Sequence, residues 1–494
     1  MTDYAFYSLI PAITTIAVSV ISHNVSLALF MGILSGVFVI SGAAPAVIAE
    51  KTCHYAYATF ADLERIEISL FVMLIGGLLE IMSASGAYYM LASALAKKLD
   101  SARKSRLATW LLGVFIFFDD YANVLIAGSS MRRINSINKA SIAQIGYIVD
   151  IVSEIASVAI ISTWAAYEGS IMFESSAKFG LNKSSMELLI SSLPYHFYTY
   201  TGIALAFLTA YTGRWFGTGF ETKAAAACES EPDELDKNIR THHFLVPVLS
   251  LIAMAFGGLF ISGYISLKLK NETSITLIKI LSNSPTIEVL LVSAVASTLL
   301  CVYLMKKDGV LPQSSYFKIF LIGKLGMSHA ALIIMLSNGL AKISGDLGTG
   351  TYITGIASGI ITQAALPAAI FAMSSLITVA TGFSWSSMAI MMPVAYQMAM
   401  AGSGVTMIPV LSGAVVSGAI SGAHMVPYSD KSVMTAAACK ITTIYHVKTQ
   451  FLNVLCAIIA SVAAYLTLGA TSSLPLAAFL SILFITAAHF IFAK

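Results

Sequence analysis

Charge is scarce in this chain of 494 residues: only 11% are Asp, Glu, Lys or Arg, while 57% are hydrophobic. A water-soluble globular protein carries about 25% charged residues, so this chain has too few charges to cover a surface that faces water. The same composition excludes disordered, collagen-like and coiled-coil proteins. What remains is an all-α polytopic membrane protein, because the apolar runs are longer than the roughly ten-residue alternating strands of a membrane barrel.

Several motifs of catalysis and ligand binding are also lacking. The five scattered cysteines form no CxxC pair, so neither a disulfide framework nor a zinc site is indicated. The chain has no GxxxxGK loop for ATP and no HExxH motif. It also lacks the mixture of basic and aromatic residues that is typical of nucleic-acid binding. We therefore expect no cofactor, no nucleic-acid partner and no enzymatic activity.

Long apolar segments fill most of the chain. Each is near or above the ~20 residues that a membrane-spanning helix needs, so the sequence predicts about twelve to fourteen membrane segments. They lie at about 6–22, 25–48, 66–95, 107–131, 141–166, 196–219, 244–265, 286–305, 316–343, 350–379, 385–402, 405–427, 450–470 and 474–492.

One markedly polar stretch, residues 221–243, divides the chain into two parts. We interpret it as a linker between an N-terminal transmembrane half, 1–220, and a C-terminal transmembrane half, 244–494. Two halves of similar length suggest internal duplication, which is common among secondary transporters.

Basic residues flank the segment 107–131 on both sides. Cytoplasmic loops are the ones enriched in Lys and Arg, so both flanks are expected on the cytoplasmic side. Because a single span cannot have both ends on one side, we expect a re-entrant hairpin that enters the membrane and returns. The alternative is an ordinary span with a basic outer loop. The basic residues are Lys97, Lys98, Arg103, Lys104 and Arg106 before the segment, and Arg132, Arg133 and Lys139 after it.

Acidic residues inside the apolar segments are the strongest functional signal, because a charge within a bilayer costs several kcal/mol. Asp150 and Glu154 are four residues apart, so one helix face presents both carboxylates. For Glu168 we expect a position at a helix end, with its side chain reaching the interface. The full set is Glu80, Asp119, Asp120, Asp150, Glu154, Glu168 and Asp430.

The sharpest cluster is FFDDYAN at 117–123, in the middle of an apolar segment. Asp119, Asp120 and Asn123 offer the oxygen ligands that a hard cation prefers. Two adjacent carboxylates also repel each other, which favours a proton on one of them. We expect this group to bind a metal ion or to carry a proton. The alternative is a polar hinge, bonded to backbone N–H groups at a helix break.

Two apolar regions of the second half are interrupted by Gly, Pro and polar residues. Around Gly382, the hydroxyl groups of Thr381, Ser384 and Ser386 favour an unwound segment whose carbonyl groups could coordinate an ion. The alternative there is a short turn outside the membrane. The second interruption holds His424, Ser429, Asp430 and Lys431.

In these motifs the sequence resembles the NhaC family of sodium/proton antiporters, within the wider ion-transporter superfamily. The resemblance covers most of the chain, and the motifs occur in the order of the family. They are LIGGLLE at 74–80, FFDDYAN at 117–123, YIVD at 147–150, ISTWAAYE at 161–168, LGTG at 347–350, ATGFSW at 380–385, MAIMMP at 388–393, SGAISG at 417–422 and HVKTQ at 446–450.

The resemblance implies a secondary transporter of the cell's inner membrane, with two inverted repeats that each contain a hairpin. It implies exchange of Na⁺ for H⁺ by alternating access. The ion- and proton-binding residues would be Asp119, Asp120, Asn123, Asp150 and Asp430, with Na⁺ held at Asp119 and Asp120. The supporting residues of the site would be Glu80, Glu154, Thr381, Ser384, Ser386, His424, Ser429 and Lys431.

The chain departs from the family at its last motif, where the family pattern resembles GDHxSPxSDT. Here Ala423 replaces the first Asp, Val426 replaces Ser, and Lys431 replaces Thr. One carboxylate is lost and one ammonium group is gained, and a nearby positive charge disfavours a bound cation. Lys431 could substitute for the sodium ion, carry the proton or receive an anionic substrate. We therefore expect a weaker dependence on Na⁺ than in related proteins.

Two other functions stay open at this point. One is the transport of an organic anion or amino acid, coupled to Na⁺ or H⁺. The other is an integral-membrane enzyme, since Asp119 and Asp120 loosely resemble the Asp-rich motif of Mg²⁺-dependent prenyltransferases, although no second acidic cluster is suitably spaced. The expected partners are the lipid bilayer and either Na⁺ and H⁺ or a small solute. The sequence leaves open whether the protein forms a homodimer.

Overall fold

The computed structural model describes residues 4–22, 24–42, 44–87, 90, 99–181, 183–217, 238–270, 275–349, 352, 355, 362–427 and 429–493, and within these ranges every regular element is a helix. In the first half the elements are η1 (Ala5–Leu9), α1 (Ile10–Ser22), α2 (Val25–Ser41), α3 (Pro45–Phe60), α4 (Leu63–Ala84), α6 (Ala102–Phe115), α7 (Asp120–Ile137), α8 (Ile142–Ser153), η2 (Glu154–Val158), α9 (Thr163–Ala177), α10 (Ser185–Ser192), η3 (Leu193–Tyr195) and α11 (Phe197–Thr212).

The second half continues with elements of the same kind. They are α12 (His242–Leu269), α13 (Leu277–Ser282), α14 (Thr286–Lys307), α15 (Ser315–Gly326), α16 (Ser328–Asp346), α18 (Leu366–Thr381), α19 (Ser384–Met398), η5 (Ala399–Ser403), η6 (Val405–Met407), α20 (Ile408–Ala423), α21 (Asp430–Cys439), α22 (Thr443–Thr471) and α23 (Leu474–Phe492). Of the predicted linker, 221–237 lies outside the described residues, and its last two residues already belong to α12.

Six of the described helices are long and apolar enough to cross a membrane alone. A seventh span results if α8 with η2 is joined to α9, although these two parts are bent by 49° at the break between them. The predicted all-α polytopic membrane protein is confirmed. Several predicted segments are divided into two helices: 107–131 into α6 and α7, 141–166 into α8 and α9, and 316–343 into α15 and α16.

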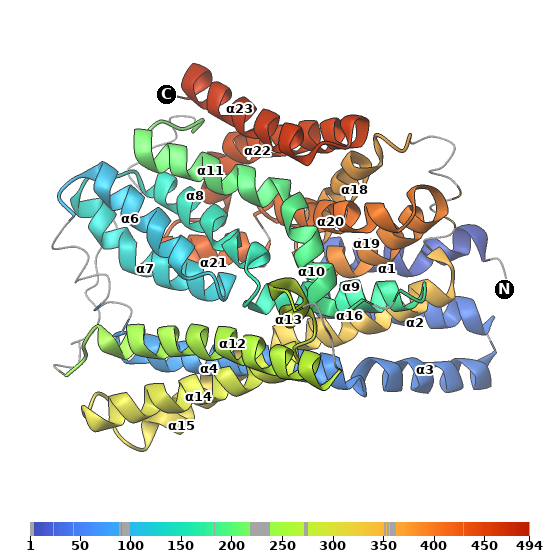
Figure 1. Cartoon of the computed structure of the whole chain (residues 1–494), viewed down its shortest axis with the longest axis horizontal. Helices are drawn as coiled ribbons and strands as arrows, with labels where there is room; N and C mark the ends of the chain where they lie inside the picture. Colours follow the sequence, from blue (N-terminus) through green and yellow to red (C-terminus); the bar gives the residue numbers. More distant parts are fainter. Residues whose placement is uncertain are drawn as a thin grey trace.

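The helices fall into two groups (Figure 1). Along one side of the molecule, α4 packs against α14 and α15, and α12 packs against α14. The broken helices lie in the other group, where α18 packs against α20 and α7 against α21. Both α9 and α16 contact α4, so they connect the two groups.

Helices α6 and α7 form a hairpin. Near its open end, Asn138 Nδ2 donates to Ser105 Oγ at 2.5 Å and to the carbonyl oxygen of Leu99 at 3.2 Å. Further in, Asn135 Nδ2 donates to Thr109 Oγ1 at 2.9 Å. The start of α6 therefore lies beside the end of α7. Entry of this hairpin into the membrane from the cytoplasmic side remains a prediction.

A second hairpin is formed by α18 and α19. Gly382 ends α18 with a φ of 75°, a left-handed conformation that a residue without Cβ adopts at little cost. Across the hairpin, Ser387 Oγ donates to the carbonyl oxygen of Ser374 at 2.7 Å. Each half of the chain thus has a hairpin followed by a broken helix: α6–α7 then α8–α9, and α18–α19 then α20–α21. We propose that these two series are the inverted repeats.

Candidate functional site

Four helix breaks meet inside the molecule, between α6 and α7, α8 and α9, α18 and α19, and α20 and α21. The first two are joined by the backbone, where Thr163 N donates to the carbonyl oxygen of Phe118 at 3.0 Å. The second and third are joined by Tyr167, whose ring stacks on Trp385 at 4.5 Å and whose hydroxyl donates to the Trp385 carbonyl at 2.7 Å. Lys431, just after the fourth break, reaches the first. In membrane transporters such meeting points of broken helices form the substrate site.

Lys431 bridges two carboxylates that come from different elements. Its Nζ atom lies 2.9 Å from Asp120 Oδ2 on α7 and 3.2 Å from Glu154 Oε1 on η2. All three side chains are buried, with at most 4% of Lys431, Asp120 or Glu154 exposed. Ser429 fixes the start of α21 by accepting a hydrogen bond from Ser432 N at 3.1 Å, and so directs this helix toward the carboxylates.

Asp119 and Asn123 hold the break between α6 and α7. Asp119 Oδ2 accepts a hydrogen bond from Thr163 Oγ1 at 3.0 Å. Asn123 Nδ2 donates to the carbonyl oxygens of Gly113 at 2.6 Å and Ile116 at 3.0 Å, two of the carbonyl groups at the end of α6. The Oδ1 atom of Asn123 is buried and has no hydrogen-bond partner in the described part of the chain, so it is available to a ligand.

Asp150 lies beside this group, but its carboxylate is already well bonded. Its oxygens are 2.9 Å from Thr435 Oγ1, 3.0 Å from His446 Nε2 and 2.9 Å from Gln450 Nε2. These donors come from α21 and α22. We infer that Asp150 mainly fastens α8 to the helices that follow the fourth break.

His424 occupies the fourth break itself. Its Nδ1 atom lies 3.0 Å from Tyr198 Oη, and its Nε2 atom lies 3.3 Å from Glu154 Oε1 and 3.9 Å from Asp150 Oδ1. Gln450 Nε2 donates to the His424 carbonyl at 3.0 Å. His424 thus lies between the Lys431 bridge and the Asp150 network.

The residues of the second hairpin reach this site through one small cavity. Ser384 lines it, while Ser386 Oγ donates to the Phe383 carbonyl at 2.8 Å and lies 3.3 Å from Thr381 Oγ1. The cavity has a volume of about 10 Å³, roughly the room that one water molecule requires. Its lining residues are Asp120, Tyr121, Glu154, Trp164, Phe383, Ser384, Trp385 and Lys431.

Three acidic residues of the sequence analysis lie elsewhere or differ from expectation. Glu80 stands apart from this group, on α4, where it faces Gly323 of α15. Asp430 begins α21, and its side chain lies outside the described residues. The prediction for Glu168 is wrong: it is fully buried, because α9 continues to Ala177 and is enclosed by α4, α10 and α19.

Several residues of the site were not predicted, namely Thr163, Tyr198, Thr435, His446 and Gln450. A signal was present for two of them. His446 and Gln450 are four residues apart in the HVKTQ motif, the same spacing as Asp150 and Glu154, and this places both on one face of α22. The hydroxyl groups of the other three have no such pattern in the sequence.

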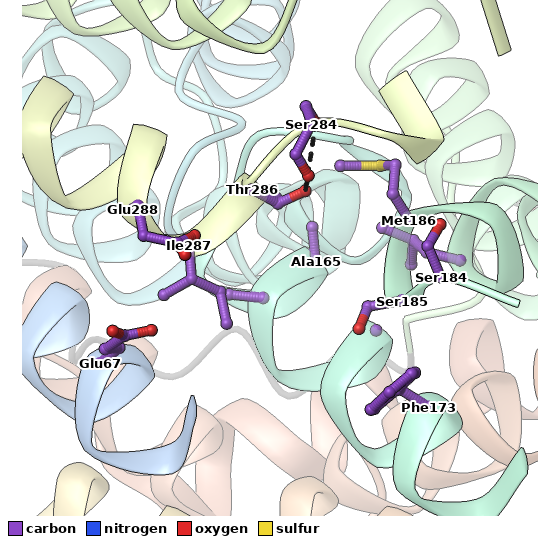
Figure 2. A pocket seen from close by; sticks show the side chains of 13 residues that line it. Glu67, Ala165, Phe173, Ser184, Ser185, Met186, Ser284, Thr286, Ile287 and Glu288 are labelled. Carbon is purple, nitrogen blue, oxygen red and sulfur yellow. Dashed lines mark hydrogen bonds between the residues drawn. The ribbon is translucent and has the colours of Figure 1, made fainter. Parts of the chain in front are cut away.

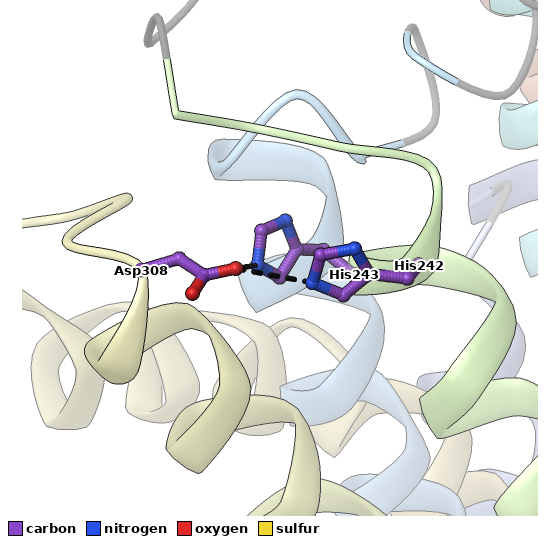
Figure 3. A group of neighbouring side chains, drawn as sticks. All are labelled: His242, His243 and Asp308. Carbon is purple, nitrogen blue, oxygen red and sulfur yellow. Dashed lines mark hydrogen bonds and ion pairs between the residues drawn. The ribbon is translucent and has the colours of Figure 1, made fainter.

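A separate group of possible metal ligands lies at the ends of α12 and α14 (Figure 3). The Nε2 atoms of His242 and His243 are 3.1 Å and 3.0 Å from Asp308 Oδ2. However, His243 Nδ1 accepts the backbone N–H of Arg240, which places the proton of a neutral ring on Nε2, where a metal would have to bind. Partial burial raises the pKa of Asp308, but the hydrogen bonds from His242 and His243 outweigh this and hold the pKa of Asp308 below its usual range. We interpret this group as a structural contact that holds the start of α12 against the end of α14.

Comparison with known proteins decides the family. A model of the Na⁺/H⁺ antiporter family matches residues 141–470, which include Asp150, Glu154 and Lys431. The chain belongs to this family. The match begins after the FFDDYAN motif, so the contact between Asp120 and Lys431 joins a part outside the matched range to a part within it.

Two further likenesses cover nearly the whole chain. The first is to an uncharacterized protein of Haemophilus influenzae, with 25% identity over 477 residues, 94% of this chain and 91% of that one. The second is in fold, to the crystal structure of the YdaH transporter of Alcanivorax borkumensis, with a TM-score of 0.55 and 12% identity over 91% of this chain and 90% of that one. Family and fold together confirm a multi-pass transporter of the cell membrane, and they indicate a transporter rather than an enzyme.

Proposed function

We propose that this protein exchanges Na⁺, or another small monovalent cation, for H⁺, and that the ammonium group of Lys431 takes the place of the cation when none is bound. One observation carries the proposal: Lys431 Nζ lies between Asp120 and Glu154, at 2.9 Å and 3.2 Å. Buried carboxylates require a neutralising partner, and an ammonium ion and a metal ion are alternatives for that role.

Competition between the Lys431 ammonium group and the metal ion would couple the flux of the metal ion to the flux of protons. A metal ion that enters between Asp120 and Glu154 must displace the ammonium group, and a buried lysine without its carboxylate partners readily gives up its proton. Oxygen ligands for the ion are present in Asp120, Glu154, Asp119 and the free Oδ1 of Asn123. When the ion leaves, Lys431 takes up a proton and returns to the carboxylates. The protein thereby carries either the ion or the proton.

Alternating access would arise from the broken elements. The site is held between two hairpins and two broken helices, and each contributes an end of a helix rather than its middle. Small rotations at these breaks can open one side of the site and close the other without breaking whole helices.

The charges of the site favour a cation over an organic anion. Asp120 and Glu154 flank a single ammonium group, so the positive charge of Lys431 is already engaged. The cavity beside Lys431 has room for about one water molecule, which is far less than a carboxylic acid or amino acid needs.

Proton flux in proteoliposomes tests this proposal. The purified protein is reconstituted with a pH-sensitive dye inside, and Na⁺, Li⁺, K⁺, a panel of carboxylates and a panel of amino acids are added in turn as salts of inert counter-ions. We expect a saturable proton efflux when Na⁺ or Li⁺ is added outside. A flux that responds only to a carboxylate or an amino acid would refute cation exchange and support the organic substrate.

A further inference from the structure

Glu168 is a buried carboxyl group that the exchange described above does not use. It lies on α9, none of its surface is exposed, and neither Oε1 nor Oε2 has a hydrogen-bond partner within the described ranges. An ionised carboxylate in such a place loses its hydration without compensation, at a cost of several kcal/mol by most estimates. Glu168 must therefore be neutral or hold a cation.

Two residues near Glu168 connect it with the Lys431 site. Glu154 lies within electrostatic range of Glu168, and the Oε2 atom of Glu154 is likewise buried without a hydrogen-bond partner among the described residues. One helical turn before Glu168, the indole Nε1 of Trp164 is also buried without such a partner, and Trp164 lines the cavity beside Lys431. Glu154 and Trp164, which both line the cavity beside Lys431, thus each carry a buried polar atom without a described partner, as Glu168 does.

Few other titratable groups act on Glu168. Tyr200 on α11 and Glu154 on η2 are both within electrostatic range of Glu168. Among the other helices that pack against α9, α4 brings the Glu67 carboxylate to the cavity that Gly169 lines. Helix α19 carries no acidic or basic residue, and Glu187 of α10 pairs with Lys183 at 3.2 Å. No basic residue in the described ranges therefore forms an ion pair with Glu168.

A larger cavity lies beside the next residue of α9 (Figure 2). It has a volume of about 340 Å³ and lies between α9 and α10 on one side and α4 and α14 on the other. Glu67 and Glu288 contribute carboxylates to its wall, which is otherwise mainly apolar, and the cavity is wide enough for water. On α9 its lining includes Gly169, the residue directly after Glu168, which packs closely against Ser185 of α10.

We propose that Glu168 is a second proton-binding residue of the transport cycle, separate from Lys431. In the conformation seen here its carboxyl group holds a proton. When a cation binds beside Glu154, this proton leaves through the water of the larger cavity, and the bound cation compensates the carboxylate that remains. It returns to the same oxygen when the cation departs. This inference rests on the proposed cation/proton exchange.

Infrared difference spectroscopy on the purified full-length protein tests the first part. We expect the carbonyl stretching band of a buried carboxylic acid, and we expect its loss when Na⁺ is added. The band should be absent in Glu168→Gln, shifted in Glu168→Asp, and unchanged in Glu187→Gln, a control that removes an exposed carboxylate from the neighbouring helix. A band that persists in Glu168→Gln, or no such band in the unmodified protein, would overturn the inference.

The ratio of protons to cations tests the second part. In proteoliposomes, the membrane potential at which flux reverses gives this ratio, and Glu168→Gln should carry one proton fewer per cation. An unaltered ratio would show that Glu168 does not exchange its proton. The infrared measurement does not depend on transport. If the protein fails to exchange cations, the proposed function is refuted, and the infrared band still shows whether Glu168 is protonated.

Discussion

Replacing Asp120 by asparagine should lower cation-driven proton flux at least about a hundredfold. The change removes one of the two carboxylates that Lys431 Nζ contacts, and loss of one member of a buried ion pair costs about 3–5 kcal/mol. At 1.4 kcal/mol per factor of ten, that loss corresponds to about two to three and a half orders of magnitude. Initial flux rates in proteoliposomes, with protein amounts matched by gel, provide the measurement.

Asp119→Asn should also impair transport strongly, because the charge of Asp119 belongs to the same break and its side chain is only 1% exposed. Asp100→Asn is the matched control. Asp100 lies just before the same hairpin, but it is exposed and pairs with Lys104 at the surface. If Asp119→Asn and Asp120→Asn both transport at the rate of the control, the ion site has been assigned to the wrong residues.

Lys431→Thr should make the stability of the protein depend on sodium. Without the ammonium group, Asp120 and Glu154 face each other unpaired in a buried site, which we expect to destabilise the protein by about 3–5 kcal/mol in sodium-free buffer. Bound Na⁺ would restore the balance, and a ligand at a hundred times its Kd adds about 2.7 kcal/mol. The Tm should therefore rise much more on addition of Na⁺ in Lys431→Thr than in the unmodified protein.

Two further variants sharpen this test. Lys448→Thr removes an exposed lysine from α22 and should leave the sodium response unchanged. Ala423→Asp combined with Lys431→Thr adds a carboxylate at the buried end of α20 and should strengthen sodium-dependent exchange further. If Lys431→Thr behaves like Lys448→Thr in both stability and transport, Lys431 is a bystander of the site.

Much of the fold was predictable because membrane helices are set by local composition. The apolar segments predicted an all-α membrane protein, and polar residues or glycine marked the breaks near Asp119, Gly382 and His424. The paired basic flanks predicted that the ends of α6 and α7 would be adjacent, and Asn138 now joins them.

The contacts within the site were not predictable in the same way. Asp120 and Lys431 are 311 residues apart, and no local pattern tells that their side chains meet. The sequence placed Lys431 beside Asp430, whereas the structure directs it to carboxylates of the other half. Glu168 was mispredicted for another reason. It lies near the end of a predicted segment, and its burial arises only from the packing of α9 against neighbouring helices.

The apparent affinity for sodium as a function of pH tests the competition between Lys431 and the cation most directly. It is measured as the KM for Na⁺ of proton flux in proteoliposomes, at a series of equal internal and external pH values. If a proton on Lys431 and a sodium ion exclude each other, the KM should rise at least about tenfold for each unit that the pH falls, as for one competing proton, and more steeply where Glu168 also releases its proton. A KM that stays constant across the pH range, while the maximal rate alone changes, would contradict the competition.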